Sequence, residues 1–245
     1  MSKDYLRNIF LIFTRDFQEY RKKKLMWIFI ALFLIGGIGC GSGMISVANG
    51  IQDTNSVKGQ EIWLMILGNV LVLYSIVPQI ISIPLFSTTP LTYEKANGVV
   101  MSLLATEMKP SQIWIGKSLA IFFPGLIASM GSLLIMLPCF MTIIKIPISV
   151  ILCAFLILPI SMLLLSMITV QVAMIKSVEK AIAPSYILGF LLLAIFPAGS
   201  FTGAYLPGSM AFTMICLAIL VFFLVMELVI THKTTIEKII LARVN

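Results

Sequence analysis

Long apolar runs alternate with short polar segments along this chain. Six runs of roughly twenty residues or more carry few charges, at residues 25–47, 61–87, 115–138, 149–175, 184–203 and 209–231. An α-helix needs about 20 mostly apolar residues to cross a bilayer, whereas the strands of a membrane β-barrel alternate between apolar and polar positions. The pattern therefore predicts an all-α polytopic membrane protein with six transmembrane helices in a single domain, residues 1–245.

Residues 1–24 precede the first run and have a different pattern. Leu6, Ile9, Phe10, Phe13 and Phe17 recur at intervals of three and four residues, and charged residues occupy the other faces. This spacing predicts an amphipathic helix that lies in the membrane interface. A disordered basic tail is the alternative.

The first run, residues 25–47, resembles a signal peptide in having a basic segment before it and a possible cleavage site at Ser46-Val47-Ala48. The leading segment is long for a signal and has its own amphipathic pattern, so we expect an uncleaved span. Within it, Gly37/Gly41 and Gly39/Gly43 form two overlapping GxxxG pairs, which predict close helix packing.

Two later runs contain prolines and polar residues. Pro78 and Pro84 predict a kink in the second span. We expect its amides, Asn69 and Gln79, to form interhelical hydrogen bonds; the alternative is that they line a path through the bundle. The segment from Pro197 to Pro207 interrupts the fifth span and predicts a helix that stops short, followed by a re-entrant segment before span six.

Charge placement predicts the orientation. Hydrophobic residues make up 60% of the chain and charged residues only 11%, compared with about 25% charged in soluble domains. Of the 17 Lys and Arg residues, only Lys58 and Lys145 fall on the side opposite the termini. The positive-inside rule then predicts a multi-pass cell-membrane protein with cytoplasmic N- and C-termini. The basic motifs of nucleic-acid-binding modules are missing, so no nucleic-acid partner is expected.

Motifs for chemistry are missing from the sequence. It contains no GxxxxGK[ST], no HExxH and no GxSxG, and its one histidine is His232. The four cysteines show no CxxC spacing and are expected to be buried apolar residues. The acidic residues lie almost entirely in the loops, and Glu227 is the exception because it lies within a span. We expect Glu227 to reach the interface or to pair with a lysine of the tail. The sequence predicts no catalytic residue, no metal site and no enzyme activity in this chain.

A polar segment between the second and third runs, residues 88–117, has a distinct pattern. Residues 93–106 contain no proline and are expected to form one helix. One face of that helix is apolar and comprises Ala96, Val99, Val100, Leu103 and Leu104. The opposite face comprises Glu94, Lys95, Gly98, Ser102, Ala105 and Thr106, with Met101. Small residues on this second face permit another protein surface to approach the backbone closely.

The sequences YEKANGVVMSLLAT (residues 93–106) and PSQIWIGK (residues 110–117) resemble the coupling-helix region of type-2 ABC transporter permeases. In that family an E-K-E-R-G-T-L-E-x-L-L-A-T-P-like run follows the second span, and I-x-x-G-K opens the third. The matching residues are Glu94, Lys95, Gly98, Leu103, Leu104, Ala105, Thr106, Ile113, Gly116 and Lys117.

The resemblance implies a permease subunit with a cytoplasmic coupling region, residues 88–114. It implies a separate ABC ATPase subunit that binds ATP and Mg, a second permease subunit in a homo- or heterodimer, and a prokaryotic source. Partner contact is expected at Glu94, Lys95, Gly98, Ser102, Leu103, Leu104 and Thr106. Ala96, Asn97 and Met101 replace charged residues of the family pattern, so we expect docking to depend on shape more than on ion pairs.

The predicted function is export of a hydrophobic or amphipathic substrate, such as a peptide, a lipid-like compound or a drug, by a permease embedded in membrane lipid. The methionines are expected either to pack or to line an adaptable apolar path. The alternative is a non-transporting membrane scaffold or an immunity protein that binds a lipid or peptide.

Overall fold

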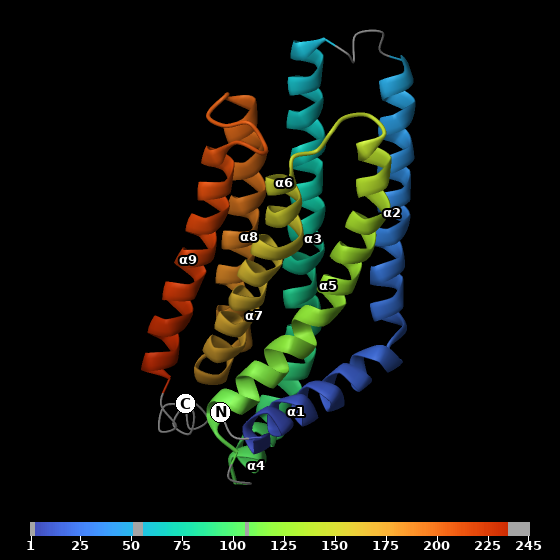
Figure 1. Ribbon diagram of the computed structural model, residues 1–245. Coiled ribbons are helices and arrows are strands. Elements are labelled where there is room, and N and C mark those ends of the chain that lie inside the picture. The colour runs from blue at the N-terminus through green and yellow to red at the C-terminus, as the bar shows by residue number, and fades with distance from the viewer. Residues whose placement is uncertain (1–2, 51–55, 106–107, 235–245) are drawn as a thin grey trace.

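The computed structural model describes residues 3–50, 56–105 and 108–234 of the chain, with the side chains of Lys3, Val100, Met101, Leu104 and Glu179 not described. The described residues are helical almost throughout (Figure 1). The elements are α1 (Lys3–Lys22), α2 (Lys24–Gly50), α3 (Val57–Ala96), α4 (Val99–Ala105), α5 (Pro110–Met141), α6 (Ile148–Leu152), the π-helical turn η1 (Cys153–Ile157), α7 (Leu158–Ile175), α8 (Val178–Phe201) and α9 (Met210–Lys233).

Six of the helical segments in the described residues are long and apolar enough to cross a membrane, namely Lys24–Gly50, Val57–Ala96, Pro110–Met141, Ile148–Ile175, Lys180–Phe201 and Met210–Lys233. Large apolar side chains such as Ile35 on α2 and Val221 on α9 remain exposed, as expected for helices that face lipid. The prediction of an all-helical protein with six spans is therefore confirmed.

The second and third spans are much longer than a membrane requires. α3 has 40 residues and α5 has 32, which correspond to about 60 Å and 48 Å of helix, compared with about 30 Å of hydrocarbon. α3 continues through Pro78, Pro84 and Pro90 without ending. Both helices therefore extend beyond the bilayer, and they meet at the end of the bundle where α1 and α4 lie (Figure 1).

The prediction that the fifth span stops before Pro197 is wrong, because α8 continues through this proline to Phe201. The chain then turns back at Gly203 and Gly208, whose φ values of 74° and 91° suit glycine. Tyr205 of this turn lies against Gly199 and donates a hydrogen bond to the carbonyl of Phe196 at 2.7 Å. The turn thus packs onto the last part of α8. A re-entrant segment is not confirmed.

Two apolar clusters form the core. The larger one includes Leu71 of α3, Leu165 of α7 and Phe196 of α8. The second lies near α1 and includes Ile12, Met26 and Ile113. Because the second cluster joins α1 to α2 and α5, the amphipathic helix packs against the bundle in addition to being covalently connected to α2.

Packing of α1 on the bundle is aromatic as well as aliphatic. Phe13 and Phe17 stack on each other at 5.6 Å, and both rings meet the edge or face of Phe123 on α5 at 5.5 Å and 5.1 Å. Such aromatic pairs contribute about 0.5–1.5 kcal/mol beyond the area that they bury. The apolar spacing seen in the sequence therefore corresponds to a face of α1 that docks on α5.

Candidate functional site

The polar segment after the second span begins as a continuation of α3. We expected one helix over residues 93–106, and this expectation is wrong: α3 ends at Ala96 and α4 starts at Val99. Gly98 has φ 67°, the left-handed conformation that commonly ends a helix. Glycine adopts this conformation without the steric cost that a Cβ imposes. The bend at Asn97–Gly98 therefore redirects the chain from α3 into α4.

Four charged side chains from three helices meet beside this bend, and we call them the junction cluster: Arg15 and Asp16 of α1, Glu94 of α3 and Lys117 of α5. Lys117 Nζ lies 2.6 Å and 2.5 Å from the two carboxylate oxygens of Glu94 and 3.1 Å from Asp16 Oδ2. Arg15 lies 2.7 Å from Asp16 Oδ1 and 3.4 Å from Glu94 Oε1. The cluster contains two cations and two carboxylates, so its charges balance.

Burial makes these ion pairs different from ordinary surface pairs. The side chain of Lys117 is 2% exposed, that of Asp16 8% and that of Glu94 15%, whereas Arg15 is 43% exposed. Removing one partner of a buried pair leaves an uncompensated charge and costs several kcal/mol. The junction cluster therefore ties α1, α3 and α5 together only while its charges remain balanced.

The carboxylates of the cluster also affect the groups of α1. Partial burial opposes the charged form of Arg15, but Asp16 and Glu94 outweigh it and raise the pKa of the guanidinium above its usual value. Burial, reinforced by Asp16 and Glu94, raises the pKa of Tyr20 well above its usual value. Arg15 therefore stays cationic and Tyr20 neutral at physiological pH.

Gly116 explains how α1 approaches α5 so closely. A Cβ at Gly116 would lie 2.8 Å from Ile12 Cβ and 3.0 Å from the carbonyl oxygen of Ile9. These contacts are too short for any side chain, so only glycine fits without a shift of α1. Gly116 thus leaves room for the backbone of α1, and the next residue, Lys117, forms an ion pair with Asp16 of α1.

The remaining predicted partner contacts are arranged as follows. Lys95 Nζ donates to the carbonyl of Lys176, between α7 and α8, at 2.7 Å. Ser102 is exposed on α4 and donates a hydrogen bond to the carbonyl of Val99 at 2.8 Å. Leu103 packs against the apolar cluster near α1. Thr106 and the side chain of Leu104 lie outside the described residues. Of the predicted polar contacts, Glu94 and Lys95 thus bind within the chain, and Ser102 faces outward.

The two predicted glycine pairs of α2 differ in their surroundings. A Cβ at Gly37 would lie 2.9 Å from Ser132 Cβ, and one at Gly41 would lie 3.2 Å from Cys139 Sγ. At Gly39 and Gly43, a Cβ would have no atom of the described chain within 4 Å. Gly37 and Gly41 therefore face α5, and the other pair lies on a face of α2 that the described residues leave uncovered.

Polar residues within the spans connect helices. Gln79 donates to Ser129 on α5 at 3.1 Å, and Ser200 on α8 donates to Asn69 at 3.2 Å. Gln171 on α7 donates to Glu227 on α9 at 3.0 Å. Each contact joins two spans, so the amides and Glu227 have an interhelical structural role.

Sequence reasoning missed Arg15 and Asp16 as partners of the coupling region. It noted Gly116 and Lys117 only as parts of a motif. The heptad-like pattern of α1 shows its apolar face but not which acid on its other faces meets α5. Lys117 stands at the start of an apolar run, where a charged side chain needs an acidic partner. That requirement is the signal in the sequence that points to an acid elsewhere in the chain, such as Asp16.

No family model, curated protein or solved structure matches this chain. In the part of the chain that the structure describes, no group of three or more His, Cys, Asp or Glu residues is placed to hold a metal ion. The functional interpretation therefore depends on the geometry of the junction and on the sequence resemblance.

Proposed function

We propose that this chain is the permease subunit of an ATP-driven exporter, related to type-2 ABC transporter permeases. A separate cytoplasmic ATPase would bind ATP and Mg and dock at α4. A second permease subunit would complete the path. In the orientation that the positive-inside rule predicts, the termini, α1 and α4 lie in the cytoplasm.

The observation that carries the proposal is the continuity of α3 from the membrane to the polar bend. A push on α4 would reach the membrane because α3, which ends at Ala96 just before the bend, continues into the spanning bundle without a break. The buried ion pairs of Glu94 with Lys117, and of Lys117 with Asp16, fasten this lever to α5 and α1. Lys95 fastens it to the turn between α7 and α8. Displacement of the bend would therefore move several spans together.

ATP binding drives such a change only if the ATPase contacts the permease differently in its open and closed states. We expect the exposed side of α4, including Ser102, to make those contacts. Glu94 serves a different role from the one expected from the sequence: it transmits the movement instead of contacting the partner.

Substitution at Ser102 tests whether α4 is the docking site of the ATPase. Ser102 is preferred to Gly98 because any L-residue at Gly98 would strain the backbone at its positive φ. The chain is co-expressed with the product of a neighbouring reading frame that contains an ATPase phosphate loop, and the chain is purified in mild detergent. We expect Ser102→Trp to abolish recovery of the ATPase because a bulky ring blocks close approach to α4. The matched control is Thr202→Trp, an exposed position in the turn after α8 at the opposite end of the bundle.

Equal recovery of the ATPase with Ser102→Trp and Thr202→Trp would contradict docking at α4. If the unsubstituted chain never recovers an ATPase, the non-transporting scaffold becomes the better interpretation.

A further inference from the structure

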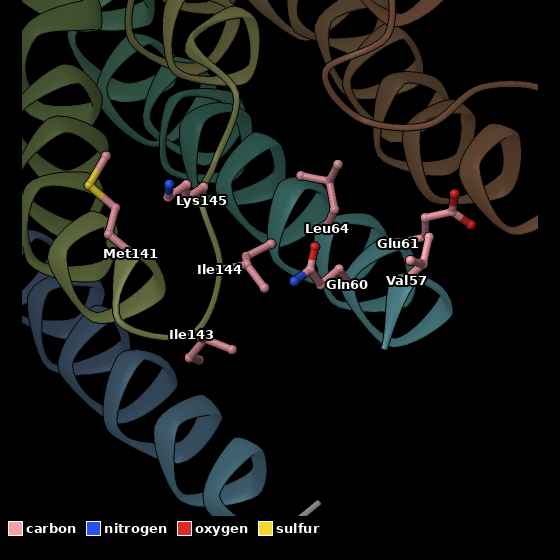
Figure 2. Close-up of a pocket in the computed structure, with 8 residues that line it drawn as sticks. All are labelled: Val57, Gln60, Glu61, Leu64, Met141, Ile143, Ile144 and Lys145. Atoms are coloured by element: carbon pink, nitrogen blue, oxygen red, sulfur yellow. The ribbon is translucent and has the colours of Figure 1, made fainter. Parts of the chain in front are cut away.

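Two cavities flank the first turns of α3, at the end of the bundle opposite α1 and α4. The larger has a volume of about 890 Å³ and lies between α2 and α3. The smaller, of about 580 Å³, lies between α3 and the segment that follows α5 (Figure 2). Val57 lines both cavities. Each has a volume in the range of ligand sites, about 300–1,000 Å³.

The larger cavity is lined mainly by apolar side chains. Its walls include Met44 and Val47 of α2 and Ile62, Trp63 and Ile66 of α3. Both helices belong to membrane spans, so this cavity lies beside the hydrocarbon and its interface. An apolar chain fits this surface better than a polar solute does.

The rims carry the cations of this end of the bundle. Lys58 lines the larger cavity and Lys145 the smaller one, and both side chains are exposed. They are the only Lys or Arg residues in the sequence from 25 to 94 and from 118 to 175. Neither forms an ion pair with any described residue. The start of α3 adds the partial positive charge of a helix N-terminus at the same place.

Among the residues that the structure describes, one acid lines these cavities. Glu61 lines the smaller cavity, and Figure 2 shows its carboxylate at the far side from the Lys145 amine, with Gln60 and Ile144 between them. Glu61 therefore leaves Lys145 free to meet an anion. Apolar walls with an unpaired cationic rim are complementary to an amphiphile that has an anionic head.

We propose that these cavities bind a lipid with an anionic phosphate head group, its acyl chain in the larger cavity and its head at Lys58 and Lys145. This names the substrate class of the exporter and so rests on the proposed function. The lipid would reach the site sideways from the bilayer, because the apolar wall is built from two membrane-spanning helices.

Trp63 provides a direct probe because it lines the larger cavity. The purified chain carrying Trp27→Phe and Trp114→Phe, which retains Trp63 alone, is placed in phosphatidylcholine vesicles without any ATPase. Brominated phosphatidylglycerol or brominated phosphatidylcholine is then added over the same series of mole fractions, and quenching of tryptophan fluorescence is measured at each step. We expect the anionic lipid to quench at an apparent concentration on the order of tenfold lower, since each lysine near an anionic head contributes about 1 kcal/mol.

Charge variants make the test specific. Lys58→Gln with Lys145→Gln should remove the preference, whereas Glu61→Gln at the same rim should not lower it. A chain with Trp27 as its only tryptophan, near the opposite end of α2, should show a preference that the two lysine changes do not alter.

Equal quenching of Trp63 by the two lipids, or a preference that persists without both lysines, would overturn the inference. Relief of quenching by inorganic phosphate at matched ionic strength would also overturn it, because the site would then select a free anion. The ATPase is absent from this measurement, so its failure leaves the docking experiment at Ser102 unaffected.

Discussion

Lys117 illustrates how one side chain can hold three helices. Its ammonium group is almost fully buried and lies within 3.1 Å of carboxylates from α1 and α3. A buried lysine is stable there only because Asp16 and Glu94 replace the water that it loses. The cluster thus depends on charge balance more than on any single contact.

Loss of that balance should destabilise the protein. Lys117→Gln leaves two carboxylates with Arg15 as their only cation in the cluster, and we expect it to lower the free energy of unfolding by about 3–5 kcal/mol. Glu94→Gln combined with Lys117→Gln leaves the Arg15–Asp16 pair balanced and should recover more than half of the loss. Unfolding in mixed detergent micelles, followed by circular dichroism, measures both. If the double variant is as unstable as the single one, charge balance is not what the cluster requires.

Gly98 and Gly116 show how far the sequence predicts such residues. The sequence assigned Gly98 to a small docking face, but the structure gives it a conformational role through its φ of 67°. A helix-period pattern cannot reveal this, because a single left-handed residue leaves the spacing of its neighbours nearly unchanged. Gly116 was visible in the sequence only as part of a motif. Glycine is required there because Ile12, about one hundred residues earlier in the chain, packs against this position.

At the scale of elements, apolar runs predicted the spans well and their ends poorly. α3 continues for nine residues past the predicted limit at residue 87 because Pro90 is tolerated and the polar residues that follow are good enough helix formers. The same cause explains α8, which passes through Pro197. Hydropathy measures where a helix leaves the membrane, whereas helix propensity and capping decide where it ends.

The face with which α2 meets α5 gives a prediction with an internal control. At Gly37 a Cβ would lie 2.9 Å from Ser132 Cβ and 3.1 Å from its Cα, so backbone would have to move. Gly37→Ala should therefore destabilise the protein by about 1–3 kcal/mol through overpacking. Gly39→Ala, two residues away with open space around it, should be neutral or slightly stabilising because alanine favours helix. Thermal unfolding of the two variants under identical conditions measures the difference; equal Tm values would contradict the packing described for α2 and α5.

At the scale of the whole molecule, the two ends of the bundle differ in character. One end carries α1, α4 and the buried junction cluster, and the other carries two cavities with Lys58 and Lys145 at their rims. The proposed transport cycle joins these ends through α3, which begins at the cavities and finishes at the bend. Composition predicted membrane residence, but the connection between the ends became visible only when the length of α3 was known.

The orientation of the bundle can be tested with two cysteines. Lys and Arg accumulate on the cytoplasmic side of membrane proteins, and among the described residues Lys58 and Lys145 are the only ones at the end of the bundle away from α1 and α4. We therefore expect Lys145→Cys, in a background where the four native cysteines are replaced by serine or alanine, to react with a membrane-impermeant maleimide in intact cells. Lys180→Cys, exposed at the start of α8, should react only after the cells are permeabilised. The reverse pattern would place the junction cluster outside the cell, where no ATP-driven subunit could dock, and would contradict the proposed function as well as the orientation.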